Sequence, residues 1–260
     1  MKSSLTLVFL LISLSVKGQL VIIDSLKINS VKHLSIDKSG DLYVGDIHGN
    51  VLKLDAGLEE LQRFSPSRKG GITTLDAWNP LRVFVGFGDI QEYVYLDRFL
   101  VSENRFSLQD ISSYVGVCAP SMDNNIWLVD YADFSLKKYN ISFNQIEINR
   151  AFDLVLNPND YEISQIREYQ NLVFMCDSRS GILVFDNLGN YLYTITYDGI
   201  LSFSFWKNEI NFLRGTELIS RDLYTEHLVS TPMPKGTLLA VKTEKYYFIY
   251  RNNWLFKARE

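Results

Sequence analysis

Residues 39–54 read SGDLYVGDIHGNVLKL, and this stretch decides the fold. Two short apolar runs stand on either side of a turn that contains Gly49 and Asn50. Glycine and asparagine tolerate left-handed backbone geometry, so they close tight hairpins between strands. The stretch therefore predicts two neighbouring antiparallel strands, Leu42–Asp46 and Val51–Asp55.

Two more strands flank this hairpin, Val31–Asp37 before it and Leu61–Ser65 after it, which makes a unit of four strands. Similar units return at intervals of roughly 37 to 46 residues, close to the span of one propeller blade. No segment shows a sustained helical apolar period, so few helices are expected. The sequence predicts an all-β fold, a six-bladed β-propeller of four-stranded antiparallel blades. The first strands of the later units are predicted to begin at Ile72, Val115, Ile163, Leu201 and Thr237.

The sixth unit is one strand short. It has three strands, the last of them Trp254–Lys257, before the sequence reaches Glu260. The segment Leu20–Lys27 precedes the first unit and is patterned like a missing fourth strand. Pairing these two segments removes two exposed sheet edges, so we expect the N-terminal strand to close the ring in the last blade. Two separate β-sandwiches are the alternative, and they leave both segments unexplained.

The amino-acid composition limits the classes of protein to which the chain can belong. The 260 residues are 47% hydrophobic and only 22% charged, which is typical of a globular chain. The formal net charge is −4, so no overall basic field exists for binding phosphates. No nucleic-acid partner is therefore expected.

The first 18 residues have the pattern of a secretory signal peptide. Lys2 is followed by the apolar run Leu5–Val16, and the small residue Gly18 precedes Gln19. We predict cleavage after Gly18 and a single β-propeller domain over residues 19–260. A buried N-terminal strand or helix is the alternative. The apolar run is shorter than the roughly 20 residues of a spanning helix, and no transmembrane segment is expected in the mature chain.

A glutamine directly after the predicted cleavage point, here Gln19, resembles the start of mature exported proteins of the Bacteroidetes. The mature protein is therefore expected in the periplasm, with secretion as the alternative. The two cysteines, Cys118 and Cys176, lie inside strand-like runs of different units. Because a disulfide needs Cα atoms within about 7 Å, two separate buried thiols are expected rather than a bridge.

Two blades carry a resemblance to known propellers. Ser39–Asp46 with Gly49–Leu52, and Leu172–Asp177 with Gly181–Asp186, resemble the blade pattern of NHL-type and gluconolactonase-like propellers. The resemblance supports the six-bladed fold. It also implies an alternative function, a metal-dependent lactonase-like hydrolase with a divalent cation on the axis, held by oxygen ligands that include a Glu near the start of the first blade.

The residues depart from that implied site. Ser30–His33 contains no carboxylate, and Lys32 would oppose a cation. The three histidines are far apart in the sequence and lack the spacing of a zinc site. No nucleophile elbow, phosphate loop or dinucleotide fingerprint is present. We therefore expect no catalytic residues, no metal and no cofactor, and predict that the protein is not an enzyme.

Charged residues recur in the loops that follow the second strand of each unit. These loops share one face of a propeller with the connections between blades, and a face that is acidic over one arc and basic over the other suits a polar partner. The alternative is that each Asp caps its own turn. The predicted binding residues are Asp46, Asp89, Asp133 (with Asp130 nearby) and Asp177 in the first four units, and Arg214 and Arg251 in the last two.

The connection Ala151–Asp160 is long and apolar, with Phe152, Leu154, Val155 and Leu156 in succession. Loops normally run in water, so this apolar surface predicts a partner; packing over the blade edge is the alternative. The predicted function is a non-enzymatic periplasmic propeller that binds a protein partner in an outer-membrane or envelope complex. Such a chain resembles accessory subunits of the type 9 secretion machinery, including its periplasmic plug.

Overall fold

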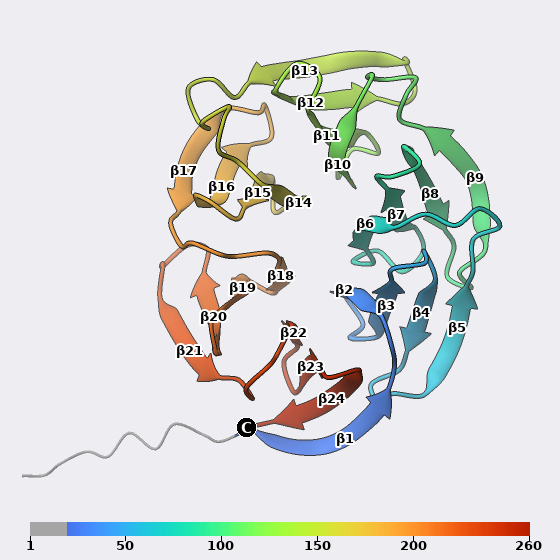
Figure 1. Ribbon diagram of the computed structural model, residues 1–260, viewed down its shortest axis with the longest axis vertical. Helices are drawn as coiled ribbons and strands as arrows, with labels where there is room; N and C mark the ends of the chain where they lie inside the picture. The colour runs from blue at the N-terminus through green and yellow to red at the C-terminus, as the bar shows by residue number, and fades with distance from the viewer. Residues whose placement is uncertain (1–19) are drawn as a thin grey trace, which may run out of the picture.

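The computed structural model describes residues 20–260, and the signal peptide predicted over residues 1–18 lies outside this range. The described chain forms 24 strands in six four-stranded antiparallel sheets. The sheets stand as blades around a central channel, so the predicted six-bladed β-propeller is confirmed (Figure 1). Residues 20–260 contain no helix long and apolar enough to cross a bilayer.

Each of the first three blades runs outward from the channel in chain order. Blade 1 consists of β2 (Val31–Ile36), β3 (Leu42–Asp46), β4 (Val51–Leu54) and β5 (Glu60–Phe64). Blade 2 consists of β6 (Ile72–Asp76), β7 (Val83–Phe87), β8 (Glu92–Leu96) and β9 (Ser102–Ser107). Blade 3 consists of β10 (Val115–Pro120), β11 (Ile126–Asp130), β12 (Ser135–Asn140) and β13 (Gln145–Ala151).

The later blades repeat this order, except that the last one takes its outer strand from the N-terminus. Blade 4 consists of β14 (Ile163–Tyr169), β15 (Leu172–Asp177), β16 (Gly181–Asp186) and β17 (Tyr191–Ile195). Blade 5 consists of β18 (Phe203–Trp206), β19 (Glu209–Arg214), β20 (Glu217–Asp222) and β21 (Leu228–Pro232). Blade 6 consists of β22 (Leu239–Lys242), β23 (Tyr247–Arg251), β24 (Trp254–Arg259) and β1 (Val21–Lys27).

The ring closes as the sequence predicts. Strand β1 pairs antiparallel with β24, from Val21 opposite Arg259 to Lys27 opposite Trp254. The two strands lie side by side at the edge of the ring where the chain also ends (Figure 1). The outer edge of β24 is therefore paired, and β1 becomes the outermost strand of blade 6.

Strand direction divides the loops between two faces. Neighbouring strands are antiparallel, so each second-to-third-strand loop lies at the same end of its blade as the connection between blades. The backbone shows this: the N–H of Ile47 donates to the carbonyl of Ser30 at 3.0 Å, and that of Tyr131 to Tyr114 at 3.1 Å. We call this the connection face. The opposite side, with the first-to-second and third-to-fourth-strand turns, is the turn face.

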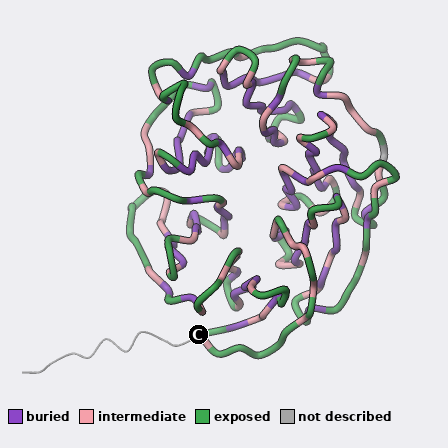
Figure 2. The backbone as a smooth tube through the Cα atoms, in the orientation of Figure 1, coloured by how far each residue is buried: buried purple, intermediate pink, exposed green. Residues whose placement is uncertain are grey.

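The core lies between blades. Inner and middle strands are buried, whereas the outermost strands are mostly exposed, as in β1 and β13 (Figure 2). Neighbouring blades approach closely where a second strand carries glycine. A Cβ added to Gly45 of β3 would lie 3.0 Å from the Ile72 side chain of the next blade, so a larger residue there would push the two blades apart.

The two cysteines are free and buried in different clusters, as predicted. Burial raises the pKa of both the Cys118 and the Cys176 thiol to about 12. Neither thiol therefore has a reactive thiolate at neutral pH.

Candidate functional site

The connection between blades 3 and 4 does not form the exposed apolar loop that the sequence suggests. Leu154 is fully exposed, but Phe152 and Leu156 are 1% and 6% exposed, and Val155 is half-buried. The N–H groups of Val155 and Leu156 both donate to the carbonyl of Phe152, at 2.7 and 2.9 Å, which turns the chain back toward the sheet.

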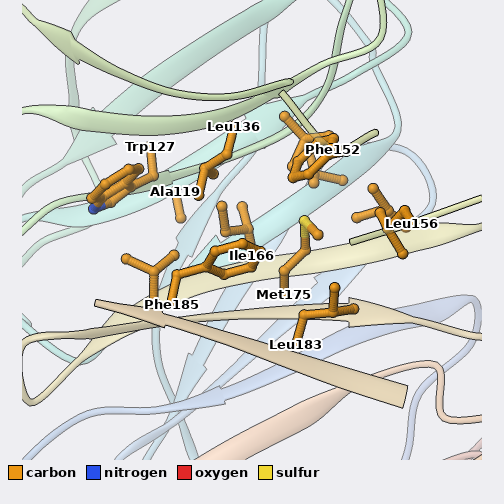
Figure 3. Close-up of a cluster of buried hydrophobic side chains, with 13 residues drawn as sticks. Ala119, Trp127, Leu136, Phe152, Leu156, Ile166, Met175, Leu183 and Phe185 are labelled. Carbon is orange, nitrogen blue, oxygen red and sulfur yellow. The ribbon is translucent and has the colours of Figure 1, made fainter. Parts of the chain in front are cut away.

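Phe152 and Leu156 fill the space between the two blades, in a buried cluster that also contains Trp127, Met175 and Phe185 (Figure 3). The expectation that they contact a partner is therefore corrected, because burying them removes apolar surface from water within the chain itself. Of this group only Leu154 projects fully into solvent, and its part in partner binding stays a prediction.

Two substitutions in this connection should distinguish its buried position from its exposed one. Leu156→Ser creates a cavity and buries a hydroxyl, so we expect it to lower the free energy of unfolding by about 2–5 kcal/mol. Leu154→Ser should change it by less than about 0.5 kcal/mol. Urea titration followed by circular dichroism measures both, and equal effects would contradict the assigned burial.

The predicted acids on the connection face cap their own turns. Asp46 Oδ1 accepts the N–H groups of His48 and Asn50 at 2.8 and 2.9 Å. Asp177 is fully buried, and its carboxylate accepts hydrogen bonds from the backbone of Glu162 and Ser180. These two acids hold hairpins in place, which is the alternative that the sequence left open.

Asp89 and Asp133 are exposed but also make local contacts. Asp89 accepts the Gly71 N–H at 2.8 Å. Asp133 lies 2.5 Å from the Lys137 ammonium, which also contacts the buried Asp130 at 2.6 Å. Burial alone would raise the pKa of Asp130, but the charge and hydrogen bond of Lys137, together with hydrogen bonds from Ser112 and the Ala132 backbone, outweigh it, and the pKa lies below the usual range.

The predicted basic residues lie on blades 5 and 6. The Arg214 guanidinium is exposed and pairs with Glu217 at 3.1 Å. Arg251 is half-buried and donates to the carbonyl of Lys235 at 3.2 Å. The acid-to-base change across the face is therefore present, with every charge tied to a local partner. Its role in binding stays a prediction.

Sequence reasoning identified Leu154 but missed four other exposed apolar side chains on the connection face. The connections into blades 3, 5 and 6 each expose one, and so does the second-to-third-strand loop of blade 1. Single apolar residues surrounded by loop residues have no periodic signal, so only the structure shows that they share a face. The set is Ile47 (50% exposed), Tyr114 (53%), Leu154 (100%), Leu201 (65%) and Leu238 (64%).

Three members of this set lie beside the channel. Tyr114 immediately precedes β10, Leu238 precedes β22, and Leu201 stands two residues before β18. On the turn face, Leu81 and Met122 stand in first-to-second-strand turns, nearer the channel, and five exposed apolar residues stand in third-to-fourth-strand turns at the outer rim: Phe99, Val101, Phe143, Leu188 and Tyr224. Beside the channel, the connection face thus has three exposed apolar residues and the turn face two.

The channel itself is narrow and is lined by both polar and apolar side chains. The cavity between the inner strands has a volume of only about 40 Å³, room for a few water molecules. His33 Nε2 donates to the carbonyl of Ile72 at 2.8 Å, and burial lowers the pKa of His33 to about 4, so its ring is neutral at pH 7. Among residues 20–260, no three His, Cys, Asp or Glu side chains group together as metal ligands would.

An ion pair crosses the channel toward the turn face. Arg167 on β14 of blade 4 contacts Asp76 on β6 of blade 2, with Nε 3.0 Å from Oδ2 and Nη2 3.3 Å from Oδ1. Both side chains are largely buried, at 8% and 11% exposed. The pair links two blades that are not neighbours in the ring.

No family model matches the sequence, and no curated protein matches it. Solved structures share its fold. The extracellular domain of a putative hybrid two-component system from B. thetaiotaomicron is 13% identical with a TM-score of 0.58, over 90% of this chain and 34% of that one. This chain thus spans about a third of that domain's length.

Two lyases are similar at the level of the fold. A streptogramin B lyase is 10% identical with a TM-score of 0.61, over 90% of this chain and 80% of that chain. A virginiamycin B lyase from Staphylococcus aureus is 7% identical with a TM-score of 0.64, over 93% of this chain and all of the other. At such identities the likeness concerns the β-propeller fold alone.

Proposed function

We propose that this chain is an exported, non-catalytic β-propeller that binds a protein partner through its connection face. The observation that carries the proposal is the exposed apolar set Ile47, Tyr114, Leu154, Leu201 and Leu238, contributed by loops from around the ring. Exposed apolar residues grouped on one face are typical of interaction sites. Energetically dominant contacts of an interface also tend to lie near its centre.

The charges of the same face fit this role. Asp89 and Asp133 lie on blades 2 and 3, and Arg214 and Arg251 on blades 5 and 6. Charges at an interface rim mainly orient the partner and speed its approach, whereas desolvated apolar residues supply most of the affinity. We therefore assign affinity to the apolar set and orientation to the charges.

The location of the protein is part of the proposal. The signal pattern of residues 1–18 supports export, with the periplasm as the expected compartment. A narrower form of the proposal is that the partner is an outer-membrane complex such as the type 9 translocon and that this chain is its accessory or plug subunit. None of the comparisons bears on that narrower form, and the identity of a co-purified partner decides it.

The test uses a triple variant, Leu154→Ser, Leu201→Ser and Leu238→Ser, in the full chain. All three side chains are exposed, so the propeller should stay folded. Losing several central contacts should reduce recovery of the partner from the native envelope by at least about tenfold. Quantitative mass spectrometry of the co-purified proteins measures the change.

A matched triple variant on the turn face serves as the control: Phe99→Ser, Phe143→Ser and Leu188→Ser. It removes a similar number of exposed apolar side chains and should leave recovery unchanged. Equal recovery with both triple variants, each of them folded, would refute the assignment of binding to the connection face.

A further inference from the structure

A second cavity opens on the turn face, away from the proposed protein-binding surface. Its volume is about 150 Å³. A cavity of this size can accommodate a molecule of about six heavy atoms. It lies where the first-to-second-strand turns of blades 2 and 3 meet the end of β14, and its wall includes Trp78, Arg82, Tyr95, Met122, Arg167 and Glu168.

One wall carries a positive charge without a carboxylate partner. The Arg82 guanidinium is held flat: its Cζ lies 3.8 Å from the centre of the Tyr95 ring, and Nη1 donates to Asn124 Oδ1 at 2.6 Å. No carboxylate among residues 20–260 lies within ion-pair distance of it. Arg167 differs, because Asp76 already neutralises it.

Tyr95 forms part of the same wall, under the Arg82 guanidinium. Tyr95 is 4% exposed, and its hydroxyl is buried without a hydrogen-bond partner among the described residues. Burial raises the pKa of Tyr95 to about 12, so the hydroxyl keeps its proton at neutral pH. The hydroxyl oxygen has almost no surface exposed to solvent, so Tyr95 supports the Arg82 guanidinium with its ring and does not offer the hydroxyl to a ligand.

Glu168 supplies the opposite charge. The residue is 8% exposed, and one of its oxygens, Oε2, accepts from Ser121 Oγ at 2.5 Å and from Trp127 Nε1 at 2.6 Å. Within residues 20–260 no cation pairs with this carboxylate, and no donor contacts Oε1. A buried carboxylate without a cation is unfavourable, so the site favours a ligand that brings one.

We propose that this cavity binds a small zwitterion of the amino-acid type, with its carboxylate against Arg82 and its ammonium against Glu168. Trp78 and Met122 cover the remaining wall with apolar surface. A simple anion would leave Glu168 unpaired, and a simple cation would leave Arg82 unpaired. Only a ligand with both charges satisfies the two groups together.

Isothermal titration of the mature protein with glycine and with L-alanine tests the proposal. Both amino acids fit the size limit, and we expect saturable binding with a dissociation constant of about 1 mM or tighter. Acetate carries only the carboxylate of such a ligand, and methylammonium carries only its ammonium group. Each should bind at least about tenfold more weakly than glycine, because one charged wall then stays unpaired.

Two variants address the residues. Arg82→Gln and Glu168→Gln should each weaken glycine binding by at least about tenfold, whereas Arg63→Gln, on exposed β5, should leave it unchanged. Arg82 is half-buried, so that variant should fold even if Glu168→Gln does not. The proposal is wrong if neither amino acid binds saturably at about 10 mM, if acetate binds as tightly as glycine, or if folded Arg82→Gln binds like the parent.

Discussion

Deleting residues 20–27 is expected to cost the mature protein several kcal/mol of unfolding free energy. The deletion removes β1, which pairs with β24 over its whole length, and each lost backbone hydrogen bond costs about 1 kcal/mol. It also removes Leu26 from the core cluster of blades 6 and 1. Because whole domains are stable by only about 5–15 kcal/mol, the melting midpoint should fall steeply. Thermal and urea unfolding followed by circular dichroism give both quantities.

The control keeps the strand and changes its surface. Ile22→Thr and Ile23→Thr alter exposed, β-branched positions of β1 and should leave the midpoint nearly unchanged. A peptide of residues 20–29, added to the deletion variant, should restore part of the lost stability, because it binds only the folded ring. A deletion variant that melts at the same temperature as the parent would contradict closure of the ring by β1.

Removing one partner of the Arg167–Asp76 pair is the second change with a large expected effect. Arg167→Met leaves the Asp76 carboxylate buried without its cation, which should cost about 3–5 kcal/mol. The double variant Arg167→Met, Asp76→Leu should cost less than either single change, because no unpaired charge remains. Urea denaturation of the three variants measures the coupling.

The exposed pair Lys207–Glu244, with Nζ 2.9 Å from Oε1, is the matched control. Both side chains are more than 60% exposed, so Lys207→Met should cost less than about 1 kcal/mol. If Arg167→Met lowers the free energy of unfolding no more than Lys207→Met does, the Arg167–Asp76 pair is not what holds blades 2 and 4 together.

The fold could be predicted because its signals are local. Alternating apolar strands and glycine-containing turns repeat within each blade, so the first strand of the third unit begins at Val115, as predicted. The closure of the ring also followed from the sequence, because a spare strand and a missing strand can be counted along the chain.

The candidate sites were less predictable because they depend on tertiary packing. Phe152 and Leu154 are both apolar and only two residues apart, yet one is buried between blades and the other is fully exposed. Arg167 and Asp76 are 91 residues apart, and no spacing in the sequence indicates that they meet. Asp177 was visible as a charged residue, but its backbone partners show that it caps a turn.

The central claim, that a protein partner binds the connection face, is tested most directly by site-specific photo-cross-linking in the native envelope. A photoreactive amino acid replaces Leu154, Leu201 or Leu238 on the connection face, or Phe99, Leu188 or Tyr224 on the turn face. All six side chains are exposed, so each variant should fold. We expect an adduct of the same partner from each of the first three positions and none from the others. Adducts only from the turn face, or from neither face, would contradict that claim.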